Sequence, residues 1–182
     1  MERDRFEQLF LPERERLLAY LAGMTGDRDA ALDAAQEAFL AAWRDIETFR
    51  EESAPLTWLI GIARRIVFRE SRRERRREGL WGSELARYGG MGGAAARDDA
   101  AAASAASDAE PGRAIEECER EERVRAAILL LPRERREAVV LHYFAGMSVA
   151  EIAIALRTRE GTIKSRLARA RAELSKRLES DL

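Results

Sequence analysis

Residues 148–177, SVAEIAIALRTREGTIKSRLARARAELSKR, contain two helix starts separated by a short turn. Ser148 and Glu151 have the spacing of a capping box, in which the serine oxygen and the glutamate carboxylate each accept a hydrogen bond from a backbone N–H group. Thr158 offers a second N-cap. The apolar residues after it recur at helical spacing, at Ile163, Leu167, Ala170 and Leu174. The stretch therefore predicts a helix-turn-helix.

The second of these helices is expected to present a basic face. A rotation of about 100° per residue places three side chains opposite the apolar stripe and two on its flanks. These are Thr162, Ser165 and Arg169, and then Lys164 and Arg166. Residues 157–177 hold eight lysines or arginines against two acids. Such a face fits the phosphates and base edges of duplex DNA, and a solvated helix surface is the alternative interpretation.

A second arginine-rich segment lies upstream, where residues 64–78 carry eight arginines and three glutamates. Between the two basic segments, residues 79–120 are rich in Gly, Ala, Ser and Asp and lack an apolar period. That composition is typical of a flexible linker. We therefore predict two small helical domains, over residues 1–78 and 121–182, joined by a flexible acidic linker over 79–120.

The N-terminal domain is expected to be a bundle of three or four helices. Apolar residues recur at helical spacing over 9–23 and over 28–46, and Pro55 has the first-turn position that proline favours in a third helix. Trp58 belongs to the apolar face of that third helix, which becomes almost continuously basic from Arg64 onward. The fold class predicted for the whole chain is all-α.

Composition also limits the classes of function. The chain has no run of 18 apolar residues and its first ten residues are highly charged, so we expect no membrane insertion and no secretory signal. One histidine, His142, and one cysteine, Cys118, cannot form a His/Cys zinc site, and no glycine-rich phosphate loop is present. We expect no cofactor, no metal and no catalytic residue. A carboxylate-only magnesium site, as in some nucleases, is the alternative that the sequence leaves open.

Three further stretches carry a family resemblance. Residues 26–50 read GDRDAALDAAQEAFLAAWRDIETFR, residues 55–78 read PLTWLIGIARRIVFRESRRERRRE, and residues 131–174 read LPRERREAVVLHYFAGMSVAEIAIALRTREGTIKSRLARARAEL. In this order they resemble the polymerase-binding helix, the minus-ten segment and the minus-thirty-five region of bacterial RNA polymerase sigma factors of the extracytoplasmic-function (ECF) type, in the sigma-70 family. The resemblance implies a factor that binds core RNA polymerase and directs promoter-specific transcription initiation.

The resemblance also implies roles for particular residues. The polymerase-binding face would contain Asp33, Gln36 and Glu37. The minus-ten element would be bound by Trp58, Arg64, Arg65, Arg69, Arg72 and Arg73, next to a loop over 49–54 that would hold an unpaired base. The minus-thirty-five element would be bound by Thr162, Lys164, Ser165, Arg166 and Arg169.

The same resemblance implies binding partners, and it also shows positions at which this chain differs from the usual pattern of the family. The implied partners are core RNA polymerase, promoter DNA and an anti-sigma factor, and the expected location is the cytoplasm, on the nucleoid. Arg157 stands where the family commonly has a glycine, at a turn position that favours positive φ. Ala34 and Ala35 stand where larger apolar residues are usual. A conventional helix-turn-helix regulator, which binds an operator without polymerase, is the alternative interpretation.

Overall fold

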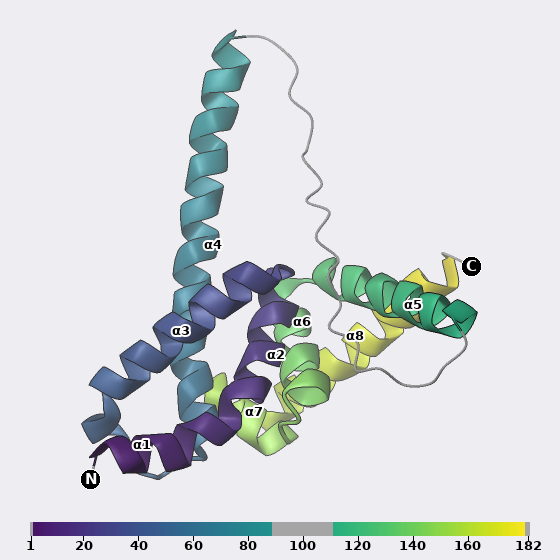
Figure 1. Ribbon diagram of the computed structural model, residues 1–182. Coiled ribbons are helices and arrows are strands. Elements are labelled where there is room, and N and C mark those ends of the chain that lie inside the picture. Colours follow the sequence, from purple (N-terminus) through teal and green to yellow (C-terminus); the bar gives the residue numbers. More distant parts are fainter. Residues whose placement is uncertain (1, 89–110, 181–182) are drawn as a thin grey trace.

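The computed structural model describes residues 2–88 and 111–180, and all regular secondary structure within these ranges is helical. The all-α fold class is thereby confirmed. The N-terminal elements are α1 (Glu2–Phe10), the short 3-10 helix η1 (Leu11–Glu13), α2 (Arg14–Thr25), α3 (Arg28–Arg44), η2 (Ile46–Thr48) and α4 (Pro55–Tyr88). The C-terminal elements are α5 (Pro111–Leu129), α6 (Arg133–Val139), the π-helical turn η3 (Val140–Phe144), α7 (Val149–Ala155) and α8 (Glu160–Ser180), as Figure 1 shows.

The single helix predicted over 9–23 is divided in the structure, and that prediction was wrong. Helix α1 ends at Phe10, η1 contains Pro12, and α2 begins at Arg14. Proline has no backbone N–H to donate, and its ring clashes with the preceding turn, so a regular helix does not continue through it. The extra helix makes the N-terminal part a bundle of four, α1 to α4 (Figure 1).

Helix α3 is held close to its neighbours by small residues. Ala34 and Ala35 are 1% and 5% exposed. Three more alanines of the helix are buried, namely Ala31, Ala38 and Ala42. Asp27 caps the start of α3, because its side chain accepts a hydrogen bond from the Ala30 N–H group at 2.9 Å. Methyl groups on the buried face let the backbone of α3 approach α2 and α4.

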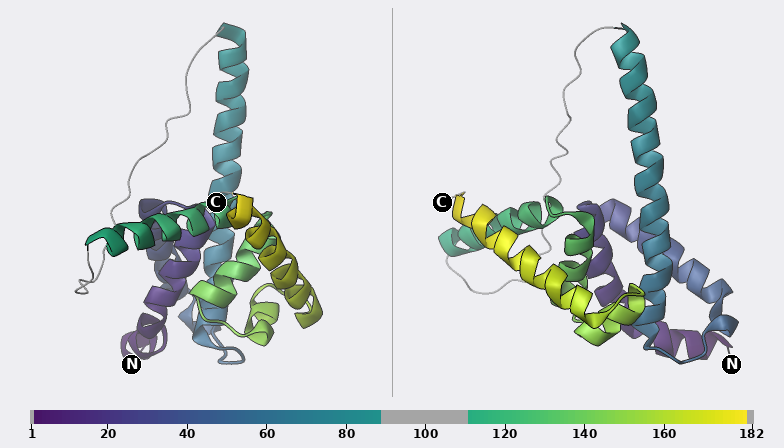
Figure 2. Two further views of the ribbon diagram at one scale, coloured as in Figure 1. Left: turned by 90° about the vertical axis from the view of Figure 1, so that its right-hand side faces the viewer. Right: turned by 180° about the vertical axis from the view of Figure 1, so that it is seen from behind.

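Helix α4 is the longest element and starts at Pro55, as the sequence predicts. It has 34 residues, which is roughly 50 Å of helix. Its C-terminal part stands clear of the other helices in every view (Figures 1 and 2). Helix α4 includes residues 79–88 and α5 starts at residue 111, so both ends of the linker predicted over 79–120 are helical. Residues 89–110 of that linker lie outside the described residues. Alanine, arginine and glutamate, which favour helix, are present at both ends.

The two predicted domains pack against each other and share one hydrophobic core. Tyr20 and Leu21 of α2 belong to that core together with Val140 and Leu141 of η3. A β-carbon placed on Gly23 would lie 2.7 Å from both γ-methyl carbons of Val140. Helix α2 is therefore in direct contact with the C-terminal half. Within the described ranges, no helix combines the length and the apolar character that a membrane span requires.

Candidate nucleic-acid interface

The helix-turn-helix predicted from residues 148–177 is formed by α7 and α8. Ser148 Oγ accepts a hydrogen bond from the Glu151 N–H group at 3.2 Å, and Glu151 Oε2 accepts one from the Ser148 N–H group at 2.8 Å. The predicted capping box is confirmed. Helix α8 begins at Glu160, one position later than an N-cap at Thr158 predicts.

The turn between α7 and α8 has the geometry expected of a glycine. Arg157 adopts a left-handed backbone conformation with φ of 51°. A side chain in this region costs about 1 kcal/mol, because its β-carbon approaches the following carbonyl oxygen. The arginine therefore adopts the positive φ that this turn position favours.

The Glu151 carboxylate makes the capping box depend on pH. Hydrogen bonds from the Ser148 backbone and side chain lower the pKa of Glu151. A lowered pKa in the folded state stabilises the protein above the unfolded pKa of about 4.3, and this contribution is lost as the pH falls through the folded value. We expect Glu151→Gln to reduce the free energy of unfolding by about 0.5 kcal/mol at pH 7, and much less below pH 4. Urea unfolding of both proteins at each pH measures this, and an equal difference at both pH values would contradict it.

A basic surface lies on α8, opposite its buried stripe of Ile163, Leu167 and Ala170. We define the α8 surface as Thr162, Lys164, Ser165, Arg166 and Arg169. Four of the five are exposed, whereas Arg166 is half-buried and forms an ion pair with Glu134 of α6 at 2.6 Å. A groove of about 560 Å³ runs between α8 and the start of α6, and is lined by all of these residues except Lys164. The structure therefore brings the predicted residues to one face.

A second basic surface lies on α4. We define the α4 surface as Arg65, Phe68, Arg69, Arg72, Arg73 and Arg76, which line a groove of about 760 Å³ together with Arg133 from the start of α6. Four of these arginines were predicted from the sequence. Arg64, which was predicted with them, does not line this groove and pairs with Glu137 of α6, its Nε lying 2.7 Å from Glu137 Oε1.

Trp58 lies apart from the arginines, within an aromatic cluster. Its ring is 5.4 Å from that of Phe10 and 5.2 Å from that of Phe49, measured between centroids. Phe49 begins the predicted base-holding loop over 49–54, in which Glu51 has a positive φ of 57°. The half-buried Trp58 therefore supports this loop from behind.

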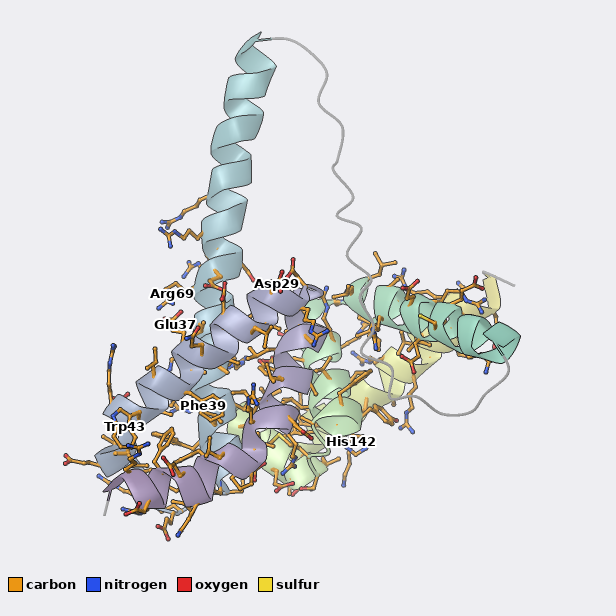
Figure 3. All side chains as sticks on the ribbon, viewed as in Figure 1. Asp29, Glu37, Phe39, Trp43, Arg69 and His142 are labelled. Atoms are coloured by element: carbon orange, nitrogen blue, oxygen red, sulfur yellow. The ribbon has the colours of Figure 1, made fainter. Side chains whose placement is uncertain are left out.

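The predicted polymerase-binding residues lie on the outer side of α3. Asp33 and Gln36 are exposed, whereas Glu37 forms an ion pair with Arg69 of the α4 surface. Figure 3 shows Glu37 and Arg69 next to each other between the two helices. We define the α3 surface as Asp33, Gln36 and Glu37 with the exposed apolar side chains Leu32, Leu40 and Trp43.

Several residues of the site were missed by sequence reasoning. Arg133, Glu134 and Glu137 come from the PRERRE segment, which was quoted only as part of a longer resemblance. Their contacts are with α4, α8 and α2, at separations that no local pattern encodes. Phe68 and Arg76 are further residues of the α4 surface whose role was not predicted. The alternation of arginine and glutamate in PRERRE was the one available signal, and it indicated only a charged helix.

The histidine and the cysteine lie outside the two basic surfaces. His142 Nδ1 lies 2.9 Å from the Met147 carbonyl oxygen within the C-terminal half. Cys118 is an exposed free cysteine on α5. In the part of the chain that the structure describes, no three histidine, cysteine, aspartate or glutamate side chains are grouped so that they could hold a metal ion.

The arrangement has clear parallels among known proteins. A family model for sigma-70 region 2 matches residues 9–77, and one for sigma-70 region 4 matches residues 121–174. The RNA polymerase sigma-H factor of Pseudomonas aeruginosa is 32% identical over 177 residues, which are 96% of this chain and 86% of that protein. The ECF RNA polymerase sigma factor EcfG of Rhodopseudomonas palustris is 33% identical over 159 residues, 87% of this chain and 77% of that one.

A solved structure has a similar arrangement of helices along the full chain. The sigma factor RpoE of Bartonella quintana, crystallised with the anti-sigma factor NepR, superimposes with a TM-score of 0.68 at 26% identity, covering 98% of this chain and 99% of that one. Both sigma regions are thus present in order, and the chain is 33% identical over 159 residues to an ECF sigma factor. The chain therefore belongs to the sigma-70 family, as an ECF sigma factor that binds core RNA polymerase and directs promoter-specific transcription initiation.

Proposed function

We propose that this sigma factor divides promoter recognition between its two basic surfaces, with the α8 surface on the minus-thirty-five element and the α4 surface on the minus-ten element. The observation that carries the proposal is the presence of two arginine-lined grooves in separate sigma regions of one chain. Tethering two modules of modest affinity raises the effective concentration of the second once the first has bound. Promoter choice then depends on both elements.

The α8 surface has the features of a recognition helix. Thr162 and Ser165 lie in the first two turns of α8, where a helix-turn-helix contacts base edges. Arg169 lies further along the same exposed face. Arg166 also lines the groove and pairs with Glu134, which is mostly exposed, so DNA can replace this partner.

The α4 surface suits an unpaired strand. Its arginines follow one another along the exposed side of a helix, which is an arrangement that can follow a phosphate backbone. The loop over 49–54 and Trp58 would hold a base that has left the stack, which offsets the few kcal/mol that unpairing costs. The protein binds and positions DNA rather than catalysing a reaction.

The α3 surface would dock on core RNA polymerase. It combines carboxylates with large exposed apolar side chains, among them Leu40 at 52% exposed and Trp43 at 41%. Exposed apolar groups bordered by charge are typical of protein interfaces. An anti-sigma factor is a further proposed partner, supported by the likeness to RpoE solved with NepR. The place of action would be the nucleoid, in the cytoplasm.

Transcription in vitro tests the proposal directly. The purified chain is added to core polymerase with a promoter library, and start sites are sequenced. Discrete start sites that share two spaced upstream elements support the proposal that each basic surface recognises one promoter element. Binding of duplex DNA without any initiation would instead favour a conventional helix-turn-helix regulator.

Arg169→Ala is expected to lower transcription from a promoter that depends on the minus-thirty-five element by roughly tenfold. One lost arginine contact to DNA is worth about 1–3 kcal/mol. Arg171→Ala is the matched control, because Arg171 is also an exposed arginine of α8 but lies on another side of the helix. Run-off transcription at limiting sigma factor measures both variants, and equal activities would remove Arg169 from the interface.

A further inference from the structure

An ion pair joins the first helix of the chain to the loop over 49–54, which we call the base-holding loop. Arg5 Nη2 of α1 donates a hydrogen bond to Glu51 Oε1 of this loop at 2.7 Å. The two residues are 46 positions apart in the sequence, so the contact is made by the fold and not by a local turn. Helix α1 therefore touches the segment that is proposed to hold an unpaired base.

The same helix also supports the base-holding loop from the inside. The fully buried ring of Phe10 of α1 lies 5.3 Å from that of Phe49, the first residue of the loop, measured between centroids. These rings anchor the start of the loop in the core. The ion pair of Arg5 acts two residues further on, at Glu51, where the side chains are exposed and the core gives no support.

Glu51 has a backbone conformation that a glycine would adopt more easily. Its φ is 57°, and within the described residues Glu51 and Arg157 are the non-glycine residues with positive φ. This conformation is disfavoured for a residue with a β-carbon, because that carbon approaches the following carbonyl oxygen. Strained backbone at a binding loop persists where surrounding contacts hold it in place. The Glu51 side chain supplies such a contact through Arg5.

The ion pair also reduces the negative charge of the base-holding loop. Glu51 and Glu52 are exposed there, against the single basic side chain of Arg50. Carboxylates repel the phosphates on either side of an unpaired base. The guanidinium group of Arg5 offsets one of these charges at 2.7 Å. Arg5 thus fixes the exposed part of the loop and makes it a better neighbour for DNA.

We propose that Arg5 and Glu51 are positioning residues for the minus-ten element, and that their ion pair holds the base-holding loop in the shape that accepts an unpaired base. The proposal rests on the proposed assignment of this loop to the minus-ten element. Arg5 acts through Glu51, and Glu51 acts through the loop backbone. A loop that already has its binding shape loses less conformational entropy when the base enters. The pair therefore strengthens the preference for the base that is held and leaves the minus-thirty-five element unaffected.

Arg5→Ala tests the proposal in the complete holoenzyme. The full chain is added in excess to core polymerase, and the mixture transcribes a promoter library in which the minus-ten and minus-thirty-five positions are randomised. We expect the preference for the best base at one minus-ten position to fall about two- to fivefold, the range of an exposed ion pair. Arg3→Ala is the matched control, because Arg3 lies on the same helix but pairs with Glu7 within α1, at 2.9 Å. It should keep every base preference of the parent.

Glu51→Gly separates positioning from stability. Glycine adopts positive φ without a steric penalty, so the melting temperature should stay the same or rise. The minus-ten preference should nevertheless fall as in Arg5→Ala, because the loop has lost its partner on α1. A merely structural role for Glu51 would leave the base preference intact, and that result would overturn the proposal.

Reversal of the pair provides a rescue. Arg5→Glu alone places two carboxylates together, so we expect a larger loss of the minus-ten preference than in Arg5→Ala. Adding Glu51→Arg should restore most of it, and Arg157 shows that this chain accepts an arginine at positive φ. Unchanged minus-ten preferences in Arg5→Ala and Glu51→Gly would overturn the inference and leave the proposed function intact. A parent protein without any minus-ten preference would overturn the proposed function together with the inference.

Discussion

Asp33→Arg combined with Glu37→Arg is expected to weaken the binding of core RNA polymerase by about 100-fold, which corresponds to roughly 3 kcal/mol. Both carboxylates lie on the α3 surface, next to the exposed side chain of Leu40. The two arginines reverse the charge of this face, so that it would repel the basic groups of the polymerase that the carboxylates would attract. Titration of the fluorescently labelled chain with core polymerase measures the affinity.

The fold of this double variant should survive. Glu37 pairs with Arg69, but both side chains are substantially exposed, at 43% and 61%, and surface ion pairs of this kind contribute about 0–1 kcal/mol. Glu119→Arg with Glu122→Arg, at exposed positions of α5, makes the same change of net charge elsewhere and is the matched control. Undiminished binding by the α3 variant would exclude this face as the docking site.

Phe10→Ala is expected to destabilise the protein by about 3–5 kcal/mol. The ring is fully buried and contacts Phe6, Phe49 and Trp58, with centroids 5.0 to 5.4 Å apart. Its removal leaves a cavity under the loop over 49–54, so any protein that remains folded should also lose recognition of the minus-ten element.

Thermal unfolding followed by circular dichroism measures the first effect. For a chain of this size the melting temperature should fall by roughly 2–4 °C per kcal/mol. Phe144→Ala is the control of the same type, because that ring is 43% exposed, and its change should stay below about 1 kcal/mol. If the Phe10→Ala and Phe144→Ala proteins had the same melting temperature, the aromatic cluster around Phe10 would not stabilise the fold.

Local signals in the sequence predicted local structure well. The capping box at Ser148 and Glu151 starts α7, and Pro55 starts α4, because both depend on residues within one turn of the helix end. The arginines of the α8 surface follow from helical rotation alone. Pro12 carried an equally local signal, but the apolar period on both sides of it obscured the break between α1 and α2.

Contacts between the two sigma regions could not be predicted from local sequence signals. Helical periodicity indicates that Leu17 and Leu21 face a core, but it does not show which helix completes that core. Gly23 is ordinary in sequence, and its closeness to Val140 appears only when residues more than a hundred positions apart are brought together. Arg64 was grouped with its arginine neighbours for the same reason, although its partner Glu137 lies in region 4.

Arg133 lines both grooves, so the packing of the two sigma regions gathers arginines of α4 and of α8 around one shared residue. Like charges repel there, and dissolved salt screens exposed charges beyond about 8–10 Å. The half-buried Arg64 and the buried Glu137 form an ion pair of opposite sign between the same two regions. A rise in salt concentration is therefore expected to weaken the repulsion more than the Arg64–Glu137 attraction, and so to stabilise the packing of the two regions.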